Sequence, residues 1–278
     1  MANIRQTKLY AEYMTQIGWI VDETQGAYIY TKRFPLIGSA IKIQRPARIP
    51  DSEPLKTLVR KYRSFSLVIE PQPGIVPDDQ YFKLVNDRFI HTKTIHIELT
   101  SSETEIFNRF SNAKRRAVKK AQKLGVRVSI CHDFDAFIHL KNKTSDLFLG
   151  FLTTRMFRPL WNIFAPKHAC VLLATLSQEN AKESKQPIAG ILMFYIDKTA
   201  YYWMAAATKE GKSYFAPTLL VWEALKYAKH QECEIFDFEG VYDERFGSYN
   251  KDWQGFSKFK EGFGGKEVYY PAPVTLRK

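Results

Sequence analysis

Alternating hydrophobic and polar positions predict short strands along most of the chain, and two stretches share one order of elements. In the first stretch, two strands, a helix and a strand are predicted over residues 26–33, 39–44, 51–62 and 64–71. In the second, the same elements are predicted over residues 187–196, 199–206, 216–230 and 233–238. The last strand ends in an acidic residue both times, at Glu70 and at Asp237. The repetition predicts a duplicated α/β (α+β) fold, with mixed sheets flanked by helices.

Between the two stretches, the pattern predicts a strand over 94–99 and then one long helix. Ser102 and Glu105 form a capping box at its start, and Gly125 ends it. Its expected buried face has helical spacing: Ile106, Phe110, Ala113, Ala117, Ala121 and Leu124. A strand over 126–131 and a further helix over 135–152 follow. We expect an N-terminal domain over 1–100, a C-terminal domain over 101–268, and a tail over 269–278 that returns to the N-terminal domain.

Composition adds a positive charge to this picture. The 278 residues include 41 Lys and Arg against 29 Asp and Glu, which gives a formal charge of +12 and favours polyanionic partners. Three distant cysteines without a CxxC pair argue against a disulfide framework and a zinc site. No signal sequence and no apolar run of about 20 residues is present. We therefore expect a cytoplasmic protein that can touch the membrane surface peripherally without being anchored in it.

The second half of the long helix carries the strongest charge signal. Its cations are Lys114, Arg115, Arg116, Lys119, Lys120 and Lys123. RNA backbone or pyrophosphate would relieve their mutual repulsion, and a solvated surface explains the same pattern equally well. Residues 206–213 imitate the phosphate-binding loop GxxxxGK[ST]. However, Ala206 stands at the first glycine and the next helix begins only near Pro217, which disfavours a P-loop NTPase.

A stretch near the C-terminus, GFSKFKEGFGG over 255–265, combines lysine with glycine and phenylalanine. Its last three glycines permit positive φ and close approach of the backbone, and its phenylalanines recur at about one helical turn. Lys260 is then expected at the rim of a packed cleft, where it would neutralise an oxyanion or hold a phosphate. A glycine-rich turn with solvated lysines is the simpler alternative. Asp237 and Glu239 would orient an amine, act as a base, or cap a turn.

Several of these segments, taken in order, resemble the FemABX family of aminoacyl-tRNA-dependent peptidyltransferases, whose members are tandem GNAT-like folds. The matching sequences are IHIEL, NAKRRAVKKAQKLGVRV, AGILMFYIDKTAYYWMAAAT, APTLLVWEALKYAKHQECEIFDFEGV and FSKFKEGFGG. The resemblance covers most of the chain and is most specific over 94–130 and 188–265. It implies two tandem GNAT-like domains, and the absence of a long heptad segment implies no helical hairpin arm.

The resemblance also implies an activity: transfer of an amino acid from aminoacyl-tRNA to an amine of a peptidoglycan precursor, either UDP-linked or lipid-linked. Aminoacyl-tRNA is then a co-substrate, and no cofactor or metal is expected. Lys260 would stabilise the tetrahedral intermediate, and Phe259 would shape the pocket. The resemblance assigns four residues to substrate binding, Lys212, Tyr214, Asp237 and Gly240, and three to tRNA or phosphate, Arg115, Arg116 and Lys119.

Two departures from the family pattern concern the acceptor. Met14 stands where a phosphate-binding lysine is expected, and Lys212 stands where arginine is frequent, which removes a bidentate contact.

Two other functions stay open. One is an acyl-CoA-dependent GNAT N-acyltransferase, although ATKEGKSYFA does not supply the pyrophosphate loop that it would need. The other is a non-catalytic RNA-binding module, which would use the basic helix and not Lys260.

Overall fold

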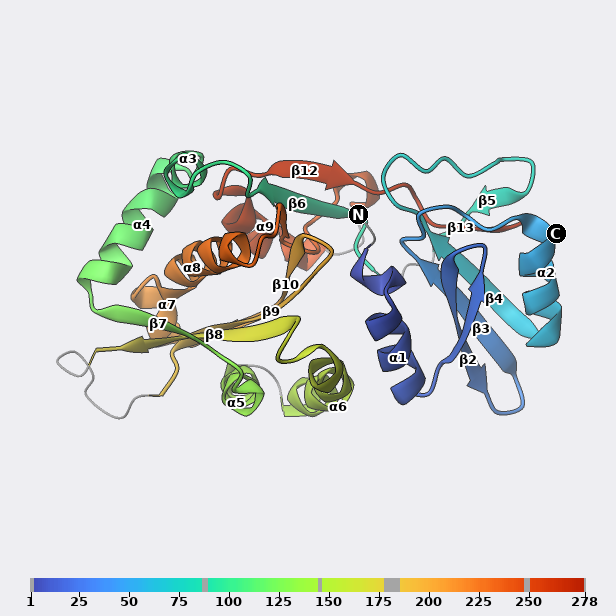
Figure 1. The fold of residues 1–278 in the computed structure, drawn as a ribbon, viewed down its shortest axis with the longest axis horizontal. Coiled ribbons are helices and arrows are strands. Elements are labelled where there is room, and N and C mark those ends of the chain that lie inside the picture. Colours follow the sequence, from blue (N-terminus) through green and yellow to red (C-terminus); the bar gives the residue numbers. More distant parts are fainter. Residues whose placement is uncertain (1–2, 87–89, 145–146, 178–185, 248–250, 278) are drawn as a thin grey trace. The chain divides into compact units, whose positions relative to one another are not determined.

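The computed structural model describes residues 3–86, 90–144, 147–177, 186–247 and 251–277, with 147–153 described by their backbone alone. The chain forms two compact units (Figure 1). Unit 1 comprises residues 1–93 and 268–278, and unit 2 comprises residues 94–267.

Unit 1 contains a six-stranded sheet in the order β1-β2-β3-β4-β13-β5. The strands are Ile20–Thr24, Ala27–Phe34, Gly38–Gln44, Ser64–Glu70, Val274–Leu276 and Phe82–Leu84. β2 and β3 are antiparallel, and β3 and β4 are parallel. The last strand of the chain, β13, therefore lies between β4 and β5, far from its place in the sequence.

Helix α2, Ser52–Lys61, connects the parallel strands β3 and β4, as a crossover connection requires. Its buried leucine Leu55 packs with sheet residues such as Ile41 and Ile69 in the core of unit 1. The 3-10 turn Ile4–Gln6 and helix α1, Lys8–Gln16, precede the sheet. Met14, which the sequence places at an expected lysine, is 1% exposed and so belongs to the interior.

Unit 2 is built on a seven-stranded sheet in the order β12-β6-β11-β10-β9-β8-β7. The strands are Lys266–Tyr269, Lys93–Glu98, Ile235–Asp237, Thr199–Ala207, Ala189–Ile196, Ala169–Leu176 and Val126–Cys131. β9 and β10 are antiparallel, β10 and β11 are parallel, and helix α8 connects the parallel pair. The predicted repetition is thus confirmed at the level of topology.

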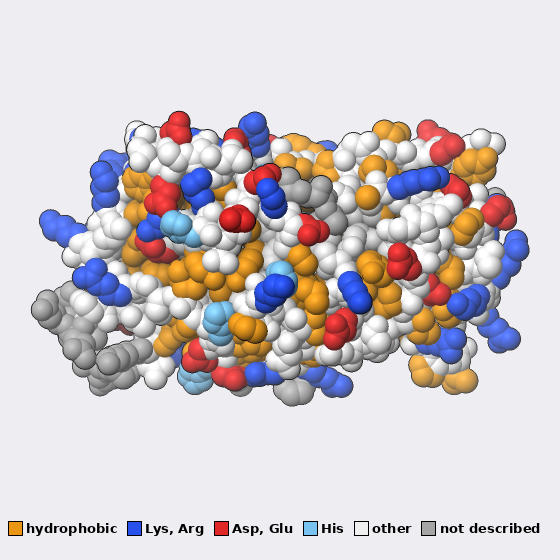
Figure 2. All heavy atoms as spheres, in the orientation of Figure 1, with side chains coloured by type: hydrophobic (Ala, Val, Ile, Leu, Met, Phe, Trp, Pro, Cys, Tyr) orange, Lys and Arg blue, Asp and Glu red, His pale blue; other side chains and the backbone are white. Residues whose placement is uncertain are grey.

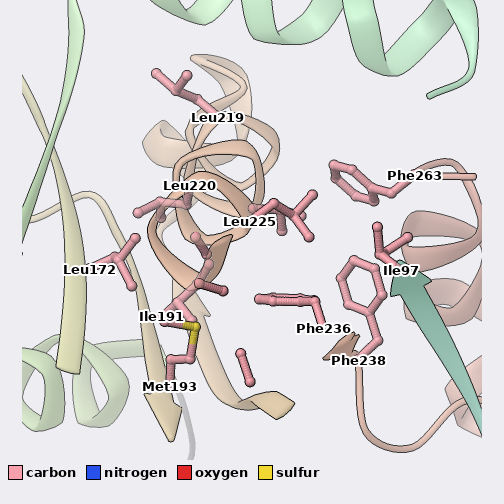
Figure 3. Packing of buried hydrophobic residues seen from close by; sticks show 14 of the residues in the cluster. Ile97, Leu172, Ile191, Met193, Leu219, Leu220, Leu225, Phe236, Phe238 and Phe263 are labelled. Carbon is pink, nitrogen blue, oxygen red and sulfur yellow. The ribbon is translucent and has the colours of Figure 1, made fainter. Parts of the chain in front are cut away.

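Helices cover both faces of this sheet (Figure 1). The helices of unit 2 are α3 Glu103–Asn108, α4 Asn112–Lys123, α5 Phe134–Thr144, α6 Leu147–Phe164, α7 Lys209–Ser213, α8 Ala216–His230 and α9 Gln254–Glu261, with 3-10 turns Glu244–Phe246 and Lys251–Trp253. Figure 3 shows side chains of α8, such as Leu220 and Leu225, packed against Ile191 of β9 and Phe236 of β11. On the other face, Phe164 of α6 meets Phe194 of β9 at 5.3 Å between ring centroids.

The prediction of one helix from Ser102 to Gly125 is wrong, because the structure contains two helices, α3 and α4. The capping box at Ser102 is present, but Ser111 caps a second helix by accepting a hydrogen bond from the Lys114 amide. The break changes the phase of the buried face, so Ala113 is exposed and Val118 is buried in its place. The helix predicted over 135–152 is also divided: α5 ends at Thr144, α6 begins at Leu147, and residues 145–146 lie outside the described residues.

Candidate active site

Lys260 lies on α9 and points into unit 2. Its Nζ donates hydrogen bonds to the carbonyl oxygens of Phe238 and Gly240, both at 2.8 Å. The residue is 7% exposed. The sequence predicted a lysine at the rim of a cleft, and this is wrong in detail: the ammonium group is buried and bound to backbone. An ammonium group has three N–H donors, so one donor remains after these two bonds.

Burial also sets the acidity of this group. It lowers the pKa of Lys260 to about 8, and the nearby carboxylates of Glu239 and Asp237 oppose the shift. The side chain is therefore mostly protonated at neutral pH and close to its titration range. A buried cation of this kind interacts with a developing negative charge more strongly than a solvated lysine does.

Asp237 organises the turn that holds Lys260. One of its carboxylate oxygens accepts a hydrogen bond from the Glu239 amide at 2.7 Å and another from the Thr94 hydroxyl group. Its other oxygen lies 3.4 Å from Nε2 of His96. Glu239 adopts φ 58°, a conformation that costs about 1 kcal/mol for such a residue. These contacts favour turn capping among the roles considered for Asp237, because the turn directs the Phe238 and Gly240 carbonyls at the ammonium group.

A cavity of about 570 Å³ lies beside this lysine. Its aromatic walls come from β10, the start of α8, and α9: Tyr202, Phe215, Phe256 and Phe259. The Lys260 ammonium lies 5.5 Å from the ring centroid of Tyr202 and 4.8 Å from that of Phe256. The cation is therefore directly behind two walls of the cavity, and Phe259, predicted to shape a pocket, is part of its lining.

Two further lysines line the cavity, Lys141 from α5 and Lys212 from α7. Among the described lining residues, none is Asp or Glu, and no described residue forms an ion pair with either ammonium group. Burial lowers the pKa of Lys141 below its ordinary value. The chemistry of the cavity thus combines aromatic surface with two cations that lack an anionic partner within the described residues. Sequence reasoning missed Lys141, because no local motif surrounds it and only the packing of α5 on the sheet brings it here.

Tyr214, the other residue assigned to substrate by the resemblance, follows α7 and packs against the core of unit 2 without lining the cavity.

Gly211, the glycine of the sequence AATKEGKS that imitates a phosphate-binding loop, has a packing role. A Cβ on Gly211 would lie 2.2 Å from the carbonyl oxygen of Ile188, so only glycine lets α7 approach that strand end. The same sequence therefore builds a helix that presents Lys212, and it forms no phosphate loop.

The three residues assigned to tRNA lie on α4, and none of them lines the cavity. Arg115 donates hydrogen bonds to the carbonyl oxygens of Asn108 and Phe110, at 2.6 and 2.7 Å, and so closes the break between α3 and α4. Arg116 and Lys119 are exposed.

Two other cations of α4 reach the cavity walls from behind. The Lys114 ammonium lies 3.6 Å from the ring centroid of Phe259, and that of Lys120 lies 4.8 Å from the ring centroid of Phe215. Sequence reasoning placed both on a basic surface and missed this contact with the rings.

The glycines after α9 allow the close approach that the sequence predicted. Gly264 has φ +75°, and a Cβ there would lie 2.1 Å from the carbonyl oxygen of Arg109. A Cβ on Gly265 would lie 2.4 Å from a side-chain atom of Ile95. The phenylalanines that recur at helical spacing differ in burial: Phe263 is fully buried, whereas Phe256 is 39% exposed and lines the cavity.

The comparisons with known proteins agree with this fold. A crystal structure of FemX matches with a TM-score of 0.77 at 17% identity, over 98% of this chain and 91% of FemX. The C-terminal DUF2156 domain of a putative lysylphosphatidylglycerol synthetase from Agrobacterium fabrum matches with a TM-score of 0.60 at 13% identity, over 96% of this chain and 86% of that domain. A tandem GNAT protein from the clavulanic acid biosynthesis pathway matches with a TM-score of 0.50 at 12% identity, over 90% of this chain and 82% of that protein.

These likenesses confirm the predicted tandem GNAT-like fold, and no helical hairpin arm occurs within the described residues. No curated protein matches the sequence significantly. The model of the FemAB family matches residues 173–271, the segment that contains the cavity lysine Lys212, the turn at Asp237 and the buried Lys260. The family resemblance inferred from the sequence is therefore confirmed: residues 173–271 carry the FemAB family pattern, on a fold that nearly the whole chain shares with FemX.

Proposed function

We propose that the protein transfers an amino acid from aminoacyl-tRNA to an amine of a peptidoglycan precursor. The observation that carries the proposal is the buried ammonium group of Lys260, behind the aromatic cavity and within the FemAB segment. Acyl transfer to an amine passes through a tetrahedral intermediate with a negative oxygen. A desolvated and fixed cation is suited to stabilise that charge, because it needs no reorganisation during the reaction.

In this reaction the amine nitrogen attacks the ester carbonyl carbon of aminoacyl-tRNA. A C–N bond forms, the bond from that carbon to the 3′ oxygen of tRNA breaks, and one amine proton ends on the departing oxygen. The remaining N–H of Lys260 would donate to the carbonyl oxygen as it becomes negative, which requires the Tyr202 or Phe256 side chain to move aside, because Lys260 itself does not line the cavity. Asp237 and Gly240 act indirectly in this scheme, since their turn supplies the carbonyl groups that hold the ammonium in place.

The cavity is suited to bind the 3′ end of the donor, aminoacyl-tRNA. Aromatic side chains such as Tyr202, Phe256 and Phe259 offer surfaces on which a nucleotide base can stack. Lys141 and Lys212 can hold a phosphate, and a charged hydrogen bond of this kind contributes about 1.5–3 kcal/mol. Arg116 and Lys119, exposed on α4, are then outer contacts for the tRNA backbone.

The test is product formation with labelled aminoacyl-tRNAs and UDP-linked or lipid-linked precursors, followed by mass spectrometry of the stem peptide. The variant Lys260→Ala is expected to lose about 100-fold or more of the turnover rate, as enzymes do when a single oxyanion donor is removed. Lys258→Ala is the matched control, because Lys258 is exposed on the same helix. An unchanged rate in Lys260→Ala would remove this lysine from the mechanism, and a mass increase with acyl-CoA alone would favour the GNAT-type reaction.

A further inference from the structure

The turn between β2 and β3 in unit 1 exposes large hydrophobic side chains to solvent. Leu36 is 105% exposed, Ile37 67% and Phe34 39%. Phe65, at the start of β4, is 59% exposed and lies 5.9 Å from Phe34 between ring centroids. We call these four residues the apolar tip. Figure 2 shows hydrophobic side chains gathered at this turn, at the lower right, with Lys and Arg side chains beside them.

The backbone holds this turn in a defined conformation. Gly38 has φ +103°, and a Cβ there would lie 2.5 Å from the carbonyl oxygen of Arg63, so the turn lies tightly against the start of β4. Leu36 has φ +69°, a region where asparagine or glycine is favoured and a leucine is strained. Its side chain gains no burial in return. The folded chain alone therefore gives no reason for leucine at this position.

Cations surround the apolar tip. The turn comprises residues 31–39, and beside it residues 60–66 lead from α2 into β4. These two segments contain no Asp or Glu, and they carry Lys32, Arg33, Arg60, Lys61 and Arg63. Arg33 and Arg63 are exposed beside the hydrophobic side chains. Lys32 and Lys61 have other partners: the Lys32 ammonium donates to the carbonyl oxygens of Ile17 and Gly18, and Lys61 pairs with Asp22 at 3.1 Å. Arg33 and Arg63 are therefore the cations on which the positive charge at the tip depends. The surface around the tip is therefore positive as well as apolar.

We infer that the apolar tip binds the surface of an anionic membrane, with Leu36 and Ile37 entering the headgroup region. Exposed hydrophobic side chains flanked by Lys and Arg bind such surfaces, because the former partition into the interface and the latter attract anionic lipids. A protein partner is less suited to this tip, since stable protein interfaces bury about 1,200–2,000 Å² and a few side chains on one turn offer much less. None of the described helices is long and apolar enough to cross a bilayer. Membrane contact does not require the transfer reaction proposed above, and the two are tested separately.

The experiment measures binding of the full chain to vesicles by flotation, with phosphatidylcholine alone and with phosphatidylcholine plus phosphatidylglycerol. We expect the protein to bind to the anionic vesicles. Partitioning should be at least about tenfold weaker for Leu36→Asn/Ile37→Asn, because two hydrophobic side chains that would enter the headgroup region are replaced by polar ones. Arg33→Gln/Arg63→Gln should weaken binding to anionic vesicles and leave the small binding to neutral vesicles unchanged. The matched control is Val76→Asn/Leu84→Asn, which changes two other exposed hydrophobic residues of unit 1, at 87% and 72% exposure.

Circular dichroism and thermal melting of each variant check that it is folded. As a second readout, Leu36→Trp should show a blue shift of its added fluorescence when anionic vesicles are present. Absence of vesicle binding, or equal loss in the control pair, would overturn membrane contact through the tip. A second outcome would also overturn it: if Leu36→Asn/Ile37→Asn changes the oligomeric state and leaves vesicle binding unchanged, the tip forms a contact between protein chains.

Discussion

At the scale of single residues, the central feature is a cation whose charge is controlled by burial. Lys260 has two backbone acceptors and two aromatic neighbours, and its pKa is lowered to about 8. Sequence motifs singled out this lysine and Phe259 as candidates, because both lie in one short segment. They could not show that Lys260 is bound to the Phe238 and Gly240 carbonyls, since that contact joins two segments that meet only in the folded chain.

A dependence on pH follows from this pKa. The attacking amine must be neutral, so the rate first rises with pH. The Lys260 ammonium loses its charge above about pH 8, and this loss offsets the further gain of neutral amine. We therefore expect kcat/KM to rise up to about pH 8 and to level off there. In Lys260→Ala the residual activity should keep rising through that pH, and a bend at the same pH in the variant would assign it to another group.

The same pKa affects stability with a defined sign. The folded-state pKa is about 8, below the ordinary lysine pKa of 10.5, so between these two pH values the unfolded chain binds more protons at this lysine. The contribution of Lys260 to the free energy of unfolding should therefore rise with pH across this window. Lys260→Met should remove that contribution, and urea unfolding of both proteins at pH 7 and pH 9.5 measures it. A pH effect equal in both proteins would contradict the assignment.

Lys141 gives a second test at this scale, because the cavity brings it together with Lys212. Lys141→Ala should raise KM for aminoacyl-tRNA about tenfold with a smaller effect on kcat, since one charged contact to a phosphate is lost. Binding should also become less sensitive to salt. Lys143→Ala on the same helix is exposed and serves as the control. An effect on the precursor's KM alone would place the acceptor, and not the donor, beside Lys141.

At the scale of elements, hydrophobic periodicity predicted the repeated strands and their connecting helices, because each buries a regular face. It failed at the break between α3 and α4. Ala113 and Ala117 continue the helical spacing of Ile106 and Phe110, so the sequence there satisfies one long helix. The break depends on a tertiary contact: the Ser111 amide donates to the carbonyl oxygen of Gly262, in the segment after α9. The Ser111 cap is a local signal that the prediction of one helix passed over, whereas the contact with Gly262 cannot be read from any local pattern.

The segment after α9 should therefore be intolerant of larger residues. Gly264→Ala would bring a Cβ within 2.1 Å of the Arg109 carbonyl oxygen at a φ of +75°, and we expect it to lower the free energy of unfolding by about 2 kcal/mol or more. Gly255→Ala is the control, since no atom lies within 4 Å of the added Cβ. Urea unfolding of both variants measures the difference. Equal stability would show that the backbone there can move without cost.

At the scale of the whole molecule, strand β13 connects the C-terminal residues to the sheet of unit 1. It pairs with β4 at Ile69 and with β5 over Phe82–Leu84. This pairing joins Val274 to Ile69, which stands 205 residues earlier in the sequence (274 − 69), so the strand partners cannot be read from periodicity. The repeated topology, in contrast, was predictable, because each copy is continuous in sequence.

Removing residues 272–278 should test how unit 1 depends on that strand. Without Val274, which is 2% exposed, β4 loses its neighbour on one side and β5 loses the strand with which it pairs. We expect faster hydrogen exchange of the amides in β4 and β5, with exchange in β8 and β9 of unit 2 unchanged, because those strands pair within their own sheet. The point variant Val274→Asp should reproduce the effect on unit 1. Arg277→Ala removes only the side-chain hydrogen bonds to the carbonyl oxygens of Asp79 and Phe82, so it should affect β5 and leave β4 unchanged. If the truncated chain instead loses protection evenly in both sheets, the two units unfold as one cooperative body, and the strand stabilises the entire chain.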